Sequence, residues 1–242
     1  MRSAPSTRGA DFFVIIEKNK RRRHMDKNQQ GIELLQEGKW EEALKLFTEQ
    51  IEEKPQDPAA YINFGHVLAE MNDTERALKF YEKAVEVDHS SSAAHYALGS
   101  FYFGQERFEE SAQSFEKAIR NGMEEADAYF MLGLSFLYLD QTVMALPYLM
   151  RAVELNGDDV EARFQFALAL AKTEQYEEAE KNLQVVISQD PAHADAFYNL
   201  GVLYAGHYEQ PEKAHSYFDR ALDIQPDHML AGYGKKLLDA AN

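Results

Sequence analysis

The chain has 242 residues, a formal net charge of −16 and no cysteine. Disulfides, thiolate metal sites and cysteine nucleophiles are therefore excluded. Residues 1–24 hold seven of the 25 Lys and Arg residues but only two of the 41 acids, so the rest of the chain has a charge near −21. Nucleic acid is not expected as a partner of such a body, because phosphate binding depends on basic surface.

Residues 1–24 form a basic tail that does not fit the pattern of the rest and is expected to be disordered. Its apolar run, 12–16, is too short to span a membrane, and the basic cluster follows that run, opposite to a secretory signal. We therefore predict a cytoplasmic protein with no membrane partner. Two interpretations of Arg21 to Arg23 stay open: a tail for an anionic surface, or a translated ribosome-binding sequence, since AGGAGG encodes Arg-Arg. In the second case translation starts at Met25 rather than Met1.

From Asp26 onward the apolar spacing predicts pairs of helices separated by short breaks. The first helix of each pair, helix A, is expected at 26–37, 58–71, 92–104, 126–139, 160–173 and 194–206. The second, helix B, is expected at 40–53, 74–87, 107–120, 142–155, 176–189 and 210–224. Gly104 and Gly206 are expected in the turns from A to B, and Pro147 should kink its helix.

A last helix is predicted from Met229 to Ala241. It is expected to turn its apolar face inward and its charges to solvent, and so to cap an array that would otherwise end in exposed apolar surface. The apolar face consists of Leu230, Tyr233, Leu237 and Leu238.

The helix pairs are copies of one unit with a period of 34, apart from a last interval of 35 in helix B. A small residue recurs in helix B at Ala43, Ala77, Ser111, Ala145, Ala179 and Ala214. Four residues later stands a large one: Phe47, Tyr81, Phe115, Leu149, Leu183 and Phe218. A small residue recurs in helix A at Gly31, Gly65, Gly99, Gly133, Ala167 and Gly201. A period in the thirties is typical of a solenoid of two-helix units.

This spacing resembles the tetratricopeptide repeat, although Lys27, His95 and Arg163 stand where that family usually has Trp or Tyr. The resemblance implies an all-α solenoid, a right-handed superhelix in which a small residue lets helix A lie close to helix B. We assign six units within residues 25–226, followed by the capping helix at 227–242. The unit bounds are about 24–57, 58–91, 92–125, 126–159, 160–193 and 194–228.

The resemblance also implies that certain helix A positions line a concave groove. The helix at 127–139 is apolar on two faces, and we expect one face to pack and the other to look into that groove. The alternative is that neighbouring A helices cover these side chains. The predicted peptide-binding groove consists of Ile62, Asn63, His66, Tyr96, Phe103, Phe130, Met131, Leu134, Leu137, Tyr138, Phe164, Gln165, Tyr198 and Asn199.

The groove residues indicate the chemistry of the partner. Asn63, Gln165 and Asn199 carry amides that can hold a peptide backbone, as the family's groove asparagine does. Asp127, Glu161 and Asp195 would edge the same groove, or would only stabilise the starts of their helices. The expected partner is another protein, through a peptide or amphipathic helix with apolar anchors and some Lys or Arg. Whether that segment is extended or helical stays open.

Several functions are disfavoured by the residue types. The family's clamp for acidic C-terminal tails needs Lys or Arg where Asn28, Asn63 and Ala97 stand. No phosphate-binding loop, zinc motif or nucleophile motif occurs, so we expect no enzyme, cofactor or metal. Our first hypothesis is a non-catalytic adaptor or scaffold. The alternative is a self-associating structural protein, a homo-oligomer in which another copy covers the groove or an end repeat.

Overall fold

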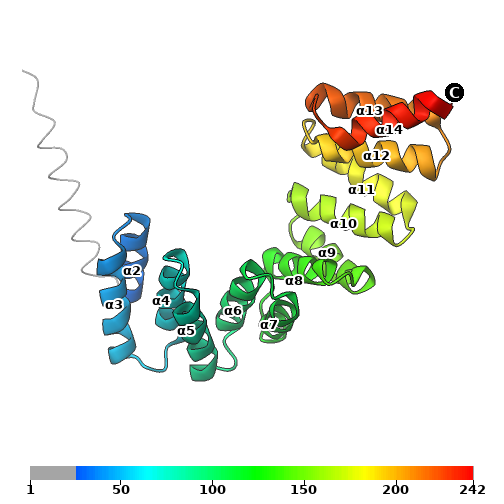
Figure 1. Cartoon of the computed structure of the whole chain (residues 1–242). Coiled ribbons are helices and arrows are strands. Elements are labelled where there is room, and N and C mark those ends of the chain that lie inside the picture. The colour runs from blue at the N-terminus through cyan, green and yellow to red at the C-terminus, as the bar shows by residue number, and fades with distance from the viewer. Residues whose placement is uncertain (1–25, 242) are drawn as a thin grey trace, which may run out of the picture. The chain divides into compact units, whose positions relative to one another are not determined.

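The computed structural model describes residues 26–241, so the predicted basic tail of residues 1–24 and the possible start at Met25 lie outside the described residues. This part of the chain contains thirteen helices and no strand (Figure 1). It divides into two compact units, one ending at Phe101 and the other beginning at Tyr102, within the same helix.

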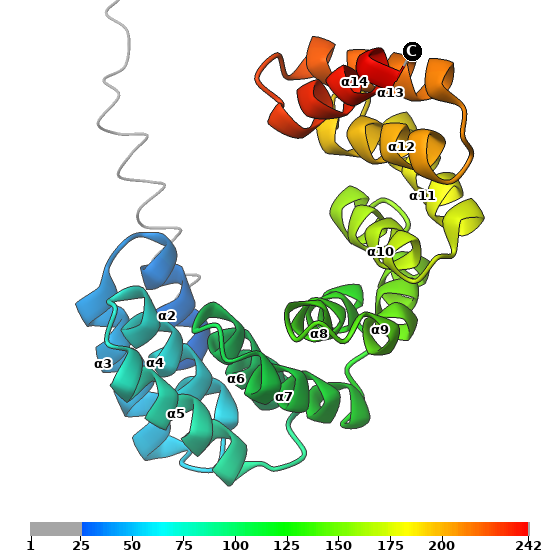
Figure 2. The same cartoon turned by 45° about the vertical axis from the view of Figure 1, so that its right-hand side comes forward.

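Every helix lies within one residue of its predicted bounds. The first unit contains α2 (Lys27–Gln36), α3 (Trp40–Glu53), α4 (Pro58–Glu70), α5 (Thr74–Val87) and most of α6 (Ser92–Gly104). The second contains α7 (Phe108–Arg120), α8 (Ala126–Tyr138), α9 (Thr142–Leu155), α10 (Val160–Lys172), α11 (Tyr176–Gln189), α12 (Ala194–Gly206), α13 (Pro211–Ile224) and α14 (Met229–Ala241). Within the first unit α2 packs against α3 and α4 against α5, and within the second α8 packs against α9, α10 against α11 and α12 against α13. Figure 2 shows this for α4 with α5 and for α12 with α13.

Glycine in helix A lets the two helices of one repeat approach closely. A Cβ atom at Gly201 would lie 2.5 Å from the Phe218 ring, and one at Gly133 would lie 2.7 Å from Leu149. The facing side chains are almost wholly buried, so they cannot move away without opening the core. The predicted role of the small helix A residue is therefore confirmed.

Each turn from helix A to helix B contains one residue in the left-handed conformation. Glu174 is an example: its φ is 64°, its N–H donates to the Ala171 carbonyl at 3.1 Å, and the next N–H donates to Leu170 at 2.9 Å. This pair of bonds satisfies the last carbonyls of the helix. The residues at this position, with φ between 52° and 73°, are Gly38, Asn72, Glu106, Asp140, Glu174 and Glu209.

The glycines expected in these turns are instead the last residues of α6 and α12. The turn does not depend on Gly104 or Gly206, because Glu106 and Glu209 adopt the left-handed conformation. Pro147 lies inside α9, which continues from Thr142 to Leu155.

Helix α14 has the predicted bounds but the opposite orientation. Leu230, Tyr233 and Leu237 are 57%, 63% and 53% exposed, whereas Ala231 is fully buried and Leu238 is partly buried. The prediction that the first three pack inward is therefore wrong. Small residues on the other face explain this, because Gly234 lets α14 lie directly on the Phe218 ring.

Polar contacts hold the same face of α14 on α13. Lys235 Nζ pairs with Asp219, and Asp239 Oδ1 lies 3.0 Å from His215 Nε2. The prediction that the charges of α14 point to solvent is therefore wrong for Lys235, which is partly buried against α13, whereas Asp239 stays exposed beside its contact. The apolar stripe of α14 remains outside.

Candidate peptide-binding surface

The first unit contributes four of the predicted groove residues. Asn63 Nδ2 donates to Asn28 Oδ1 at 2.8 Å, which joins α4 to α2. His66 is exposed, and its Nδ1 lies 3.1 Å from the Tyr81 hydroxyl. Burial raises the pKa of Tyr81 to about 12, so its hydroxyl stays protonated at neutral pH and can donate to His66. Ile62 and Tyr96 are partly buried.

Helix α8 of the second unit presents the apolar face on which the prediction was centred. Its predicted groove residues are partly buried rather than open: Phe130, Met131, Leu134 and Leu137. Helices A of successive units contact each other, as α8 and α10 do, and this contact reduces the exposed apolar area. Tyr138 at the end of α8 is the exception, because 62% of its surface is exposed.

Tyr138 belongs to a cluster of three aromatic rings. It stacks on Phe108, with ring centroids 4.5 Å apart and planes 7° apart, and meets Phe103 edge to face at 5.6 Å. Phe103 and Phe108 lie on either side of the turn between α6 and α7 and also contact each other at 5.4 Å. Aromatic pairs in these arrangements hold each other in place. The cluster therefore presents the exposed Tyr138 ring in a fixed orientation.

Phe164 does not belong to an open surface. It is 7% exposed and lies under His193, with ring centroids 4.5 Å apart, within the core of the second unit. The prediction that Phe164 is exposed in a groove is therefore wrong. Tyr198, one unit later, is partly buried under His228 at 5.3 Å. In both cases the residue preceding the next helix A covers the ring.

His193 and His228 begin helices, a role that the sequence interpretation missed. The Nδ1 atom of His193 accepts from the Ala196 N–H at 3.2 Å, and that of His228 accepts from the Ala231 N–H at 3.1 Å. An accepting Nδ1 is unprotonated, so the proton lies on Nε2. Nε2 of His228 then donates to Asp195 at 3.0 Å. Their spacing of 35, equal to the last repeat interval, was the available signal.

The predicted groove amides of the second unit bond to their own helices. Gln165 Nε2 donates to the Glu161 carboxylate at 2.8 Å, and Asn199 Nδ2 donates to the Asp195 carbonyl at 2.8 Å. An amide has two N–H groups and a carbonyl with two lone pairs, so one such bond leaves capacity for a peptide backbone.

Helix α14 adds surface that the prediction placed in the core. Leu230, Tyr233 and Leu237 stand 35 residues after Asp195, Tyr198 and Val202, the corresponding positions of α12. The exposed side of α14 therefore carries the positions that were predicted to line the groove in the other A helices. Val202 is also exposed, at 42%. Val202 and Leu237, at equivalent positions of α12 and α14, are therefore both exposed apolar residues, and exposed apolar surface often marks a binding site.

Comparison with known proteins decides the family. The tetratricopeptide repeat pattern matches residues 34–101, 96–141 with 164–229, and 126–159. The structure of YrrB, described as "a TPR protein with an unusual peptide-binding site", is 51% identical and superposes with a TM-score of 0.75. That match covers 78% of this chain and 97% of YrrB. The chain belongs to the tetratricopeptide repeat family.

More distant tetratricopeptide solenoids share the fold alone. MamA is 23% identical with a TM-score of 0.67, and the match covers 71% of this chain and 93% of MamA. PilF of Pseudomonas aeruginosa is 21% identical with a TM-score of 0.70, and the match covers 93% of this chain and all of that one. A search of curated proteins gave no match. The predicted family and the all-α solenoid fold class are confirmed.

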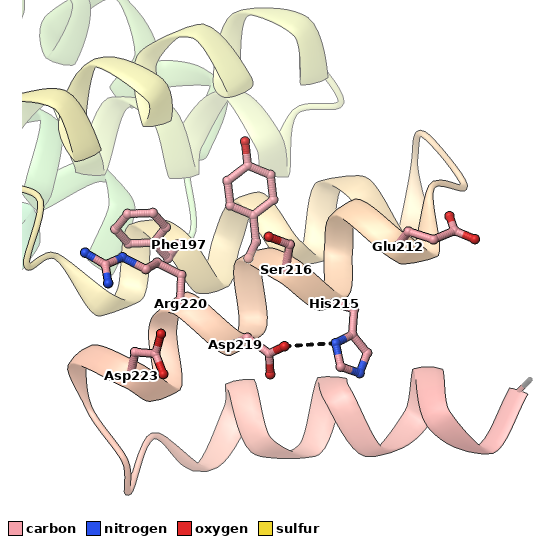
Figure 3. Close-up of a pocket in the computed structure, with 8 residues that line it drawn as sticks. Phe197, Glu212, His215, Ser216, Asp219, Arg220 and Asp223 are labelled. Atoms are coloured by element: carbon pink, nitrogen blue, oxygen red, sulfur yellow. Dashed lines mark hydrogen bonds and ion pairs between the residues drawn. The ribbon is translucent and has the colours of Figure 1, made fainter.

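One further hollow of this tetratricopeptide protein lies along α13 and has a volume of about 530 Å³ (Figure 3). Its lining includes His215 and Ser216, which are residue types found in hydrolases. Both ring nitrogens of His215 face carboxylates, however, with Asp219 at 3.1 Å and Asp239 at 3.0 Å. His215 therefore has no nitrogen available to activate the Ser216 hydroxyl, and its contacts join α13 to α14.

Within residues 26–241, no helix combines the length and the apolar composition needed to cross a bilayer.

Proposed function

We propose that this tetratricopeptide protein is a non-catalytic, cytoplasmic adaptor that binds a segment of another protein on the exposed face of its A helices. The anchors we assign in the second unit are Phe130 and Tyr138 on α8, Val202 on α12, and Tyr233 and Leu237 on α14. Asn63, His66 and Tyr96 are the candidate contacts in the first unit. The segment is a peptide or an amphipathic helix.

The observation that carries this proposal is apolar surface left uncovered on the A helices of the second unit. Tyr138 and Tyr233 are 62% and 63% exposed, although large aromatic side chains gain free energy when they are buried. Each large apolar side chain covered by a partner contributes roughly 1.5–3 kcal/mol before entropic costs. The peptide-binding site described for YrrB supports a similar activity in this chain.

Charge supports a partner with Lys or Arg beside its apolar anchors. On this side of the A helices, Asp195 accepts a hydrogen bond from His228, and Glu161 accepts one from Gln165. A carboxylate accepts several hydrogen bonds, so both can also accept from a cationic partner. The overall charge of −16 would also attract a cationic partner segment.

The proposal is tested by capture from native cytosol with the wild type and the double variant Phe130→Ala with Tyr138→Ala. We expect the variant to lose a partner that the wild type retains, while its helical content stays close to wild type. The matched control is Val185→Ala, which truncates an exposed apolar side chain of the outer helix α11. Equal capture by the wild type and the Phe130 and Tyr138 variant would refute the proposal.

Self-association remains the second candidate, because the stripe on α14 lies at the end of the described array. In that case another copy would cover Leu230, Tyr233 and Leu237. Light scattering on dilution distinguishes the two candidates. A mass that does not change with concentration supports the adaptor, and a dimer that Tyr233→Ala with Leu237→Ala dissociates supports self-association.

A further inference from the structure

The outer helix α9 carries an apolar stripe that no other helix B in residues 26–241 has. The stripe consists of Val143, Met144, Pro147 and Met150, of which the first two and the last are 73%, 50% and 46% exposed. Pro147 is exposed as well. Because Val143, Pro147 and Met150 are spaced by four and three residues, they lie along one side of the helix.

The five other B helices are polar at these positions. In register with Val143 stand Glu41, Glu75, Glu109, Glu177 and Glu212. In register with Met144 stand Glu42, Arg76, Glu110, Glu178 and Lys213. In register with Pro147 stand Lys45, Lys79, Gln113, Lys181 and Ser216. In register with Met150 stand Thr48, Glu82, Glu116, Gln184 and Asp219. The apolar stripe is therefore a property of α9 and not of the repeat.

The stripe does not stabilise the helix that carries it. The packed face of α9 consists of other residues, Thr142, Ala145, Leu149 and Ala152. Val143 and Met144 replace first-turn acids, which favour a helix start. Pro147 has no N–H, so the Val143 carbonyl loses the donor that the helix would otherwise supply. Val143, Met144 and Pro147 each make the helical conformation of α9 less stable. Their role therefore lies outside the packing of this chain.

The stripe borders a pocket of about 430 Å³ between α9, α10 and α11. Pro147 and Met150 belong both to the stripe and to the lining of the pocket. Leu146, Phe166 and Leu170 complete the apolar part of that lining. Of the described residues that line the pocket, Glu178 alone is charged. The pocket can receive a large apolar side chain, and the flexible methionines beside it adapt to the shape of what enters.

We propose that the α9 surface, meaning the stripe and this pocket, binds an amphipathic helix of another protein. The partner helix carries apolar residues at helical spacing along about 10 Å, the length of the stripe from Val143 to Met150. It carries Lys or Arg at the edge of that face, because the chain as a whole is acidic and Glu178, which already pairs with Lys181 at 2.6 Å, can accept further hydrogen bonds. A second copy of this chain is disfavoured as the occupant, because it brings the same negative charge to the contact. This surface is separate from the A-helix face of the proposed function.

The test uses the full chain and a synthetic 18-residue peptide with Leu at positions spaced by four and three residues and Lys at the edges of that face. A peptide of the same composition with a scrambled order is the control. Binding is measured by fluorescence anisotropy, and the contact is located by NMR of the methionine methyl groups. We expect the Met144 and Met150 signals to shift, and the scrambled peptide to bind at least tenfold more weakly.

The matched variant restores the side chains of the other B helices: Val143→Glu with Met144→Glu and Met150→Glu. It should fold at least as well as the wild type, because α3, α7 and α11 already begin with paired acids. We expect it to weaken binding at least tenfold, whereas Lys79→Ala, at the position of α5 in register with Pro147, leaves binding unchanged within twofold. Pro147→Lys, which copies Lys45 and Lys181, should also weaken binding at least threefold and serves if the triple variant is unstable.

Three results would overturn the proposal. The first is equal binding by the wild type and by both α9 variants. The second is a shift of Met131, on the A-helix face, in place of Met144 and Met150. The third is a dimer of the wild type that becomes monomeric in the triple variant, because that result would assign the α9 surface to a second copy.

Discussion

Two helices of the second unit, α10 and α14, show how the same repeat position can be buried or open. Phe164 of α10 and Tyr233 of α14 occupy equivalent positions, yet they are 7% and 63% exposed. Phe164 lies under His193, which begins the next helix A, whereas no helix in the described residues follows α14. The repeat therefore fixes the direction in which a side chain points. The following repeat decides whether that side chain is core or surface.

The largest expected effect comes from truncating the two rings of this comparison. Phe164→Ala should lower the free energy of unfolding by about 3–5 kcal/mol, because it leaves a cavity in the core. Tyr233→Ala should lower it by less than about 1 kcal/mol, because the ring is mostly in water. Urea unfolding followed by circular dichroism measures both. Equal losses would contradict the assignment of one ring to the core and the other to the surface.

Two glycines that face the same ring sharpen the comparison. A Cβ atom would lie 2.5 Å from the Phe218 ring at Gly201 of α12 and 2.8 Å from it at Gly234 of α14. Gly201→Ala should cost about 2–3 kcal/mol of unfolding free energy, since neighbours on both sides hold α12 in place. Gly234→Ala should cost about 1 kcal/mol, because α14 packs on α12 and α13 from one side and can shift away from them. The thermal unfolding midpoints of the two variants test which substitution is more destabilising. A larger decrease in midpoint for Gly234→Ala than for Gly201→Ala would contradict the prediction.

The turns between helices A and B predict a stabilising change. Glu174 is held at a φ of 64°, a conformation that disfavours residues with a Cβ atom. Glu174→Gly should therefore raise the free energy of unfolding by about 1 kcal/mol. Glu177→Gly, in the first turn of α11, is the matched control and should lower it by about 1 kcal/mol. Destabilisation by both variants in chemical unfolding would show that the turn is not strained.

The smallest expected effect concerns the polar contact that orients α14. Hydrogen bonding to Lys235 holds the pKa of Asp219 below its ordinary value of 3.8. A carboxyl with a lowered pKa stabilises the fold above its ordinary value, and that contribution is lost as the pH falls through the pKa of the folded state. Because Asp219 is 45% exposed, Asp219→Asn should cost only about 0.5 kcal/mol at neutral pH.

The pH dependence of the midpoint separates this contact from a general loss of packing. The wild type and Asp219→Asn should differ at pH 7 and converge as the pH is lowered below 3.8. If the two midpoints differ by the same amount at pH 7 and below pH 3.8, the carboxylate charge does not hold α14 on α13.

The helices and the close contact between the two helices of each repeat were predictable, because the sequence pattern that produces them is local and recurs six times. A glycine in helix A and a large residue in helix B meet closely, as Gly133 and Leu149 do. The exposure of Phe164 was not predictable from the repeat, because it depends on His193 of the next unit. The orientation of α14 was missed because Ala231 and Gly234 pack more closely on α13 than the larger residues of the opposite face could.

The A-helix residues predicted as a peptide-binding groove keep their place in the repeat, but only some of them are available. Tyr138 and His66 are exposed, whereas Phe130 and Leu134 are partly covered by contact between neighbouring A helices. The apolar stripe on α9 is visible in the sequence once the B helices are compared in register. It was missed because binding residues were sought in the A helices alone.

The proposed binding of a protein segment by uncovered aromatic side chains of the A helices is tested most directly by isothermal titration. The captured partner is titrated into the wild type, Tyr138→Ala and Phe164→Leu. We expect Tyr138→Ala to weaken binding at least tenfold with an unchanged unfolding midpoint. Phe164→Leu, a change in the core, should lower the midpoint but keep the affinity. Unchanged affinity in Tyr138→Ala together with a loss in Phe164→Leu would contradict the proposed binding face.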